Sequence, residues 1–313
     1  MDDLLMSKYG RQIEVLNKTL WENRALGPKV NEWLANFADN EEKKYALYIL
    51  SRLTYFNDHD IRFLLKVLYR DLYRYPIIQE IRDLNYGTYE DNIIETEFKS
   101  RLQKTRFLGV GNLSESGTYL LYYFRQENKI PKDLFISSDN VFLYVADCDL
   151  HIQNAFGDVS HYVFIDDMCG TGKQATSDSS NVKTCVANIR KIHPDAKISY
   201  YMLFGMTTGI NRIRESGLYD SVEALIELDD SYRCFHEQSR YFIDGEYNIL
   251  KAKEIMYKYG IRLLGEKRAL GYGNCQLLIS MHHNTPDNTL PVIWYDEDNK
   301  WTPIFKRYNK IYK

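Results

Sequence analysis

The stretch that decides the fold is His161-Tyr-Val-Phe-Ile-Asp166-Asp167-Met-Cys-Gly170-Thr171-Gly172-Lys173-Gln174. Its first part, residues 162–165, is an apolar strand of the kind that lies buried on both faces in the middle of a parallel sheet. Two adjacent acids and a glycine-rich turn follow that strand. Both features are therefore expected at the carboxyl edge of the sheet, where α/β proteins bind ligands.

The two acids restrict where this strand can end. Adjacent residues of a strand point to opposite faces, so a strand interior would bury one of the carboxylates. Because an unpaired buried carboxylate is costly, we expect the strand to end at about Asp166, with Asp166 and Asp167 both at the rim. There they can accept hydrogen bonds from sugar hydroxyls or help to hold a divalent metal. The turn can direct backbone N–H groups at a phosphate, so the stretch suits a 5-phosphoribosyl group.

Other phosphate-binding motifs do not fit this stretch. A P-loop needs a glycine five residues before Gly172 and a serine or threonine after Lys173, but Asp167 and Gln174 stand there. The dinucleotide fingerprint also fails, because the segment that begins Gly109-Val-Gly111 has Ser114 in place of its third glycine. A buried strand with an ordinary turn remains the plain structural alternative.

The rest of the chain predicts an α/β fold with a mostly parallel sheet and helices on both faces. From residue 106 onward, strand-like apolar segments alternate with helical stretches. Residues 1–104 instead look helical, with apolar stripes at residues 46, 49, 50 and 53 and at residues 61, 64, 65, 68 and 72. We therefore expect a helical N-terminal region, 1–104, for packing or partner docking, and an α/β domain, 105–313. The predicted strands are 106–111, 141–146, 162–165, 198–203, 222–227 and 276–281.

Composition limits the class of protein. Lys and Arg number 40 against 43 Asp and Glu, which argues against a strongly basic nucleic-acid surface over the whole chain. The 5 cysteines are odd in number and form no Cys-x-x-Cys pair, which favours a reducing cytoplasm over a disulfide or zinc framework. The N-terminus shows no signal peptide, and no apolar run approaches the roughly 20 residues of a membrane span. The expected localisation is cytoplasmic, without a membrane.

A strand followed by Asp-Asp, two residues and a Gly/Thr-rich turn resembles the phosphoribosyl-diphosphate signature of type I phosphoribosyltransferases. The resemblance implies displacement of pyrophosphate from the ribose anomeric carbon, with Mg²⁺ bound through the substrate. It also implies a pyrophosphate loop after the first core strand. The site residues that it implies are Asp166 and Asp167, catalytic, on the ribose hydroxyls; Gly170, Thr171, Gly172, Lys173 and Gln174 on the 5′-phosphate; and Asn112, Ser114, Ser116 and Gly117 in the pyrophosphate loop.

A narrower resemblance includes the C-terminal part of the chain. Residues 270–279 and the loop His283-Asn284-Thr-Pro-Asp-Asn288-Thr-Leu-Pro291 resemble the PRTase-CE family, over roughly residues 90–305. That family occurs in bacterial conflict systems, some of them retron-associated. The resemblance implies an antiviral effector, either a glycosyltransferase or an enzyme that cleaves an N-glycosidic bond of a nucleotide. It also implies a reverse transcriptase with its non-coding RNA-DNA as a partner. The apolar stripes of residues 1–104 make that region a candidate for homo-oligomerisation or for docking such a partner.

The loop that holds His283, Asn284 and Asn288 has two interpretations. Its amides could read a base or an acceptor through paired donors and acceptors, but the loop also needs only to turn the chain. The function has two alternatives as well. The same fold could sense phosphoribosyl diphosphate or a nucleotide without catalysis, or its N-terminal helices could bind a nucleic acid or a partner.

Overall fold

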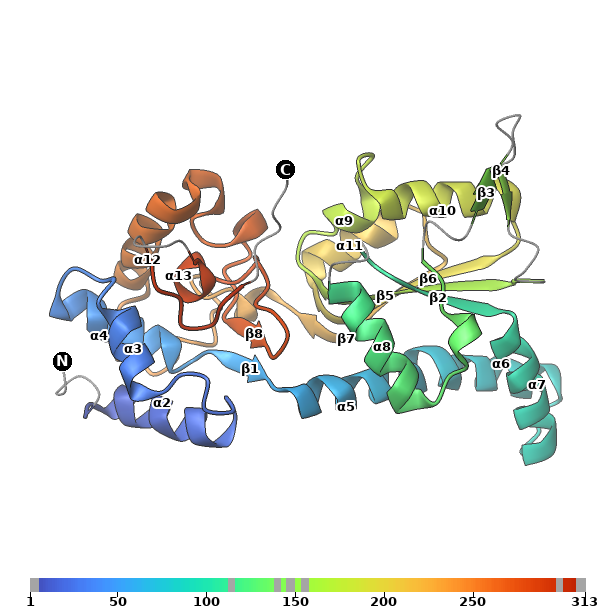
Figure 1. Ribbon diagram of the computed structural model, residues 1–313, viewed down its shortest axis with the longest axis horizontal. Coiled ribbons are helices and arrows are strands. Elements are labelled where there is room, and N and C mark those ends of the chain that lie inside the picture. The colour runs from blue at the N-terminus through green and yellow to red at the C-terminus, as the bar shows by residue number, and fades with distance from the viewer. Residues whose placement is uncertain are drawn as a thin grey trace. The chain divides into compact units, whose positions relative to one another are not determined.

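The computed structural model describes residues 6–111, 116–137, 142–144, 150–152, 158–296 and 301–307. The chain forms two compact units: Met1–Ile61 together with Leu228–Lys313, here called the first unit, and Arg62–Glu227, the second unit. Figure 1 shows the elements of each unit. The boundary expected at residue 104 lies inside the second unit, and a separation of functions at that boundary remains a prediction.

The second unit contains a four-stranded sheet in the order β2-β5-β6-β7. Its strands are β2 (Thr105–Gly109), β5 (His161–Cys169), β6 (Lys197–Met206) and β7 (Ser221–Leu228). The strands β2, β5 and β6 are parallel, and Val163 of β5 lies opposite Phe107 on one side and Ser199 on the other. The predicted α/β fold with a parallel sheet is confirmed, and four of the predicted strands form this sheet.

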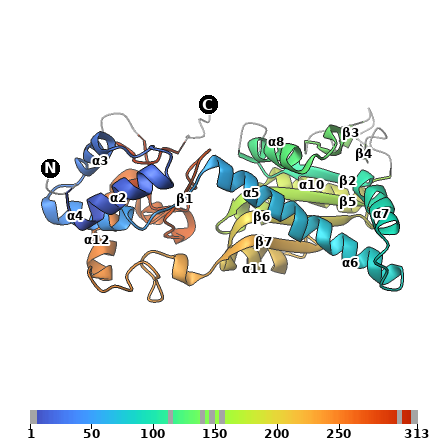
Figure 2. The same ribbon diagram turned by 90° about the horizontal axis from the view of Figure 1, so that it is seen from below.

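Helices cover both faces of this sheet, as Figures 1 and 2 show. On one face, Phe164 and Tyr200 pack in a core with side chains from the helices that follow β5 and β6. On the other face, Phe107 contacts Phe124, with ring centroids 5.4 Å apart, and Tyr73, at 5.1 Å. The helices concerned are α8 (Ser116–Asn128), α9 (Lys173–Thr176), α10 (Asn181–Ile192), α11 (Thr207–Glu215) and the π-helical turn η1 (Tyr69–Arg74).

The helical segment that carries the second apolar stripe continues through Pro76. It begins as α5 (Asp58–Leu68), passes through η1 and resumes as α6 (Tyr75–Leu84), with Pro76 in the first turn of α6. A proline cannot donate an N–H to the preceding turn, and a π-helical turn is a common way to absorb such an irregularity. Helix α7 (Asp91–Gln103) then packs on α6.

The first unit takes its core from both ends of the sequence. Ala46, Ile49, Leu50 and Leu53, which form the first predicted stripe, are buried in one cluster with residues 252–305. Strand β1 (Thr54–Phe56), which the sequence does not indicate, pairs in parallel with β8 (Ile279–Met281). The predicted strand 276–281 is therefore shorter than expected and belongs to a separate sheet. The helices of this unit are α2 (Lys8–Thr19), α3 (Gly27–Leu34), α4 (Asn40–Leu50), α12 (Ile249–Leu264) and α13 (Pro291–Trp294).

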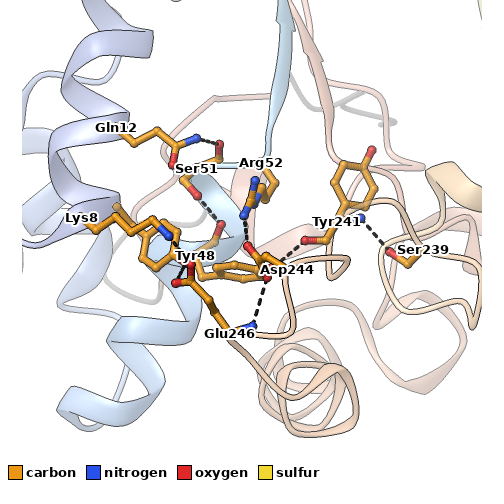
Figure 3. Close-up of polar contacts among 10 residues, drawn as sticks. Lys8, Gln12, Tyr48, Ser51, Arg52, Ser239, Tyr241, Asp244 and Glu246 are labelled. Atoms are coloured by element: carbon orange, nitrogen blue, oxygen red, sulfur yellow. Dashed lines mark hydrogen bonds and ion pairs between the residues drawn. The ribbon is translucent and has the colours of Figure 1, made fainter.

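Polar contacts also tie the N-terminal helices to the segment before α12, as Figure 3 shows. The hydroxyl of Tyr48 donates to the carbonyl oxygen of Tyr241, at 2.5 Å, and to Asp244 Oδ1, at 3.0 Å. Asp244 also pairs with Arg52, and Glu246 pairs with Lys8. Hydrogen bonds and ion pairs thus connect residues 8–52 with residues 241–246.

The remaining elements are short. Strands β3 (Phe142–Tyr144) and β4 (Leu150–Ile152) form an antiparallel pair, so the predicted strand 141–146 lies outside the main sheet. The 3₁₀ turns are η2 (Lys132–Leu134), η5 (Asp230–Tyr232), η6 (Glu266–Arg268) and η7 (Tyr272–Asn274). Within the described ranges, no helix combines the length and the apolar character needed to cross a bilayer.

Candidate functional site

The central strand β5 runs further than its sequence indicates, and this corrects one expectation. It continues through both acids to Cys169, and Asp166 lies opposite Met202 of β6. Asp166 is only 5 % exposed, whereas Asp167 is half-buried. The expectation that both carboxyl groups lie at the rim is therefore wrong for Asp166.

A tyrosine makes this burial possible. The hydroxyl of Tyr200, itself buried, donates to Asp166 Oδ2 at 2.6 Å, and the backbone N–H of Asp167 donates to Asp166 Oδ1 at 3.0 Å. Burial and the neighbouring charge of Asp167 raise the pKa of Asp166 well above its ordinary value, against the opposing effect of the Tyr200 hydrogen bond. Two close carboxyl groups of this kind ionise one after the other, so the raised pKa of Asp166 favours its protonated form.

The glycine turn after β5 is shaped by a close approach to α11. Gly172 has φ +71°, a left-handed conformation that favours glycine, and a Cβ there would lie 2.6 Å from the carbonyl oxygen of Gly209. A Cβ on Gly209 would in turn lie 2.7 Å from the carbonyl oxygen of Gly170. The packing of the turn on α11 thus accounts for the glycine at position 172, whereas the sequence pointed to contact with a phosphate.

Two hydrogen bonds fix the residues that follow the turn. The hydroxyl of Tyr219 donates to the carbonyl oxygen of Ala175 at 3.0 Å, and Thr176 Oγ1 donates to that of Gly172 at 2.9 Å. Lys173 and Gln174 are exposed. The turn 170–174 therefore has a fixed inner side and a solvent-facing outer side at the carboxyl end of β5.

The other candidate residues lie in two places. In the proposed pyrophosphate loop, Ser116 and Gly117 belong to the first turn of α8, and Asn112 and Ser114 lie outside the described residues. The loop with His283, Asn284 and Asn288 belongs to the first unit, whereas Asp166 and the turn belong to the second. Their roles in binding stay predictions.

Asn288 connects its loop to a neighbouring segment through hydrogen bonds. It is 6 % exposed, and its Nδ2 donates to the carbonyl oxygen of Tyr272 at 3.2 Å and contacts Cys275 Sγ at 3.4 Å. The carbonyl oxygen of Asn288 accepts the N–H of Leu277 at 3.1 Å. The loop 283–289 is thereby fixed to the segment 270–277.

The donor set fits one way of binding Mg²⁺. Within the described ranges, no group of three or more His, Cys, Asp or Glu side chains could hold a metal ion. Asp166 and Asp167 supply two carboxyl groups, of which that of Asp166 is buried and has a raised pKa. Mg²⁺ commonly keeps its waters and binds through one or two carboxylates plus substrate phosphates, which matches this set.

Sequence reasoning missed three residues that build the site. Tyr200, Gly209 and Tyr219 hold Asp166 and the turn from β6, from α11 and from the segment before β7. Tyr200 lies 34 residues from Asp166 along the chain, and Tyr219 lies 44 residues from Ala175. No local pattern marks them, because each matters only through the pairing of β5 with β6 or the packing of α11.

The parallel sheet, with an acid pair and a glycine turn at the carboxyl end of its central strand, defines a protein of the phosphoribosyltransferase-like class. The PRTase-CE family model matches residues 30–307, and the chain belongs to that family. The match begins well before residue 90 and so includes N-terminal helices in which the sequence shows no recognisable motif. A comparison with curated proteins found no match.

Proposed function

We propose that the carboxyl end of β5 binds a 5-phosphoribosyl compound, either phosphoribosyl diphosphate or a nucleotide. The observation that carries the proposal is the half-buried Asp167 carboxyl group, which follows the buried Asp166 in β5 and precedes a turn whose shape depends on Gly172. A partly accessible carboxyl group beside the backbone N–H groups of a turn suits a ligand with vicinal hydroxyls next to a phosphate.

The residues have distinct parts in this proposal. Asp167 accepts hydrogen bonds from the ribose hydroxyls, and Asp166, held by Tyr200, fixes the backbone at Asp167. The backbone N–H groups of 170–174 face the 5′-phosphate, and the exposed Lys173 can reach a phosphate or diphosphate. The charge of the diphosphate would be neutralised by Mg²⁺ held through the diphosphate itself, beside the carboxyl groups of Asp166 and Asp167. Catalysis by such a site is positioning and electrostatic stabilisation of charge at the anomeric carbon.

In the cell, the proposed role is that of an effector in a bacterial antiviral defence system, acting on a nucleotide or a macromolecule. Membership of the PRTase-CE family supports this role. The second candidate is a sensor that binds the same ligand without turnover. The burial of Asp166 favours it, because only one of the two carboxyl groups is then available for charge stabilisation.

Isothermal titration with phosphoribosyl diphosphate and Mg²⁺ tests the binding proposal. Asp167→Asn should weaken binding by roughly 10- to 100-fold, because a hydrogen bond to a charged group contributes about 1.5–3 kcal/mol. The matched control is Asp195→Asn, at an exposed aspartate of the same unit. Equal affinities of Asp167→Asn and the wild type would exclude this site.

Metabolite profiling separates the effector from the sensor. Cells that produce the wild type should lose a specific nucleotide or phosphoribosyl pool relative to cells that produce Asp166→Asn/Asp167→Asn. Unchanged pools together with measurable binding would support the sensor.

A further inference from the structure

The apolar stripes of the N-terminal region are covered within the molecule. The first stripe lies in the core of the first unit, and Ile61, Leu65 and Leu68 of the second stripe are also buried. Neither stripe therefore needs a partner. Several apolar side chains of this part of the chain stay exposed, and four of them follow one another closely around the connection between α6 and α7, which we call the hairpin tip, residues 83–93.

The hairpin tip exposes four large apolar side chains within ten residues. Leu84 is 71 % exposed, Tyr86 104 %, Tyr89 80 % and Ile93 41 %. Single exposed apolar residues are ordinary, whereas several within one short ordered segment favour an interaction site. Tyrosine is also a residue type that commonly anchors protein interfaces.

The tip is ordered rather than loose. The N–H of Gly87 donates to the carbonyl oxygen of Arg82 at 2.7 Å, and that of Thr88 donates to the carbonyl oxygen of Asn85 at 3.1 Å. The Arg82 guanidinium lies over the Tyr89 ring, 4.0 Å from its centroid, and donates to the carbonyl oxygen of Thr88 at 3.1 Å. A fixed aromatic surface loses little conformational freedom on binding.

Tyr86 has no structural reason to be a tyrosine. Its φ is +56°, in the left-handed region that suits glycine or asparagine, and a bulky residue there is an outlier. Its ring is fully exposed, so no internal packing compensates for the strained backbone. Strain kept at an exposed aromatic residue is expected where the side chain serves binding.

The charges around the tip indicate what it binds. Asp83, Glu90 and Asp91 are exposed, and no described residue pairs with their carboxylates. An anionic rim repels nucleic-acid phosphates and anionic lipid surfaces. It complements a protein surface whose apolar pocket is bordered by lysine or arginine.

We propose that the hairpin tip is the docking surface for a partner protein, with Tyr86 and its apolar neighbours inserted into an apolar pocket that is rimmed by basic residues. The partner is a different polypeptide from this chain. The acidic rim steers the encounter, and the aromatic centre provides the affinity.

Site-specific crosslinking tests the proposal in the natural host. The full-length protein carries the photoreactive residue p-benzoylphenylalanine in place of Tyr86, and a second version carries it in place of Tyr122, an exposed tyrosine of α8. Position 86, but not position 122, should capture one defined polypeptide. The captured protein is then purified, and its affinity for the unlabelled protein is measured by titration.

Matched variants give the decisive comparison. Tyr86→Gly should weaken binding at least 10-fold while the Tm stays equal or rises, since glycine fits the left-handed backbone. Asp83→Lys/Glu90→Lys/Asp91→Lys should also weaken binding at least 10-fold, whereas Asp195→Lys/Glu215→Lys/Glu237→Lys, with the same charge change at other exposed acids, should not. Capture of a second copy, capture of nucleic acid, no capture, or equal effects of the two triple variants would each overturn the proposal.

Discussion

Asp166 shows how one residue can combine a binding motif with the demands of a buried strand. Its carboxyl group is enclosed by the sheet and receives the Tyr200 hydroxyl and the Asp167 N–H. Only a protonated or well-compensated carboxyl group is tolerated in such surroundings. Asp166 therefore helps to fix the backbone of Asp167, whose N–H donates to the Asp166 carboxyl group.

The ionisation of Asp166 predicts a pH-dependent stability. The pKa of Asp166 is raised in the folded protein, so above about pH 4 the unfolded chain releases a proton that the folded protein retains. The free energy of unfolding then falls by up to about 1.4 kcal/mol per pH unit until the folded pKa is reached. The amide side chain introduced by Asp166→Asn cannot ionise, so the Tm of this variant should rise relative to that of the wild type as the pH increases above about 4. Parallel Tm curves in calorimetry would show that Asp166 is ionised.

The sequence predicts the residue types of the site better than their environments. Asp166 and Asp167 are recognisable from the strand before them and the turn after them. The burial of Asp166 depends on Tyr200, which becomes its neighbour only when β6 pairs with β5 in the observed register. A one-dimensional pattern contains no information about that hydroxyl.

Among the elements, α11 fixes the shape of the candidate phosphate turn. Gly172 and Gly209 allow the turn and the start of α11 to approach each other more closely than two side chains would permit. A test of a phosphate contact through Gly172→Val would therefore measure packing. Gly209 is the better position, because it lies on α11 rather than in the turn.

Gly209→Ala should displace the turn. The new Cβ would lie 2.7 Å from the carbonyl oxygen of Gly170 and 3.0 Å from Cys169 Sγ, which costs about 1–3 kcal/mol. Both the Tm and the affinity for phosphoribosyl diphosphate should fall. Gly217→Ala is the control, because nothing lies within 4 Å of its Cβ and only its φ of +64° is unfavourable. If Gly209→Ala binds as tightly as the wild type, the turn does not hold the phosphate.

Element lengths and partners were predictable only where the pattern is local. The strands 162–165 and 198–203 are confirmed as the inner parts of β5 and β6. The short pair β1 and β8 joins segments more than 200 residues apart, Thr54 lying opposite Ile279. Three residues give no periodicity, so their pairing could not be read from the sequence.

At the scale of the whole molecule, the helices of residues 1–104 are divided between two compact units. Residues up to Ile61 complete the core of the first unit, and α5 to α7 lie mainly in the second. Deletion of residues 1–104 would therefore damage both units. Charge changes at the hairpin tip test docking without that damage.

Two cores predict two separable unfolding transitions. Trp33 is fully buried in the first unit, where its Nε1 donates to the carbonyl oxygen of Val292 at 2.7 Å, and Trp33→Ala should cost about 3–5 kcal/mol. Calorimetry should show a lower Tm for the transition of the first unit and an unchanged Tm for that of the second unit. Phosphoribosyl diphosphate should still raise the Tm of the second unit. Phe107→Ala, in the second core, should have the opposite pattern. A single transition shifted equally by both variants would contradict independent cores.

The division of the first unit between the two ends of the chain has a consequence for synthesis. Residues 62–227 form a continuous segment that can close its core while the ribosome is still translating the remainder. Residues 1–61 must wait for residues 228–313, which at ~5–20 residues per second is a delay on the order of ten seconds or more. A nascent chain interrupted in this interval carries an N-terminal segment without its core partners, attached to a folded second unit. The apolar side chains of that segment would then be exposed to proteases and chaperones until residues 228–313 are made.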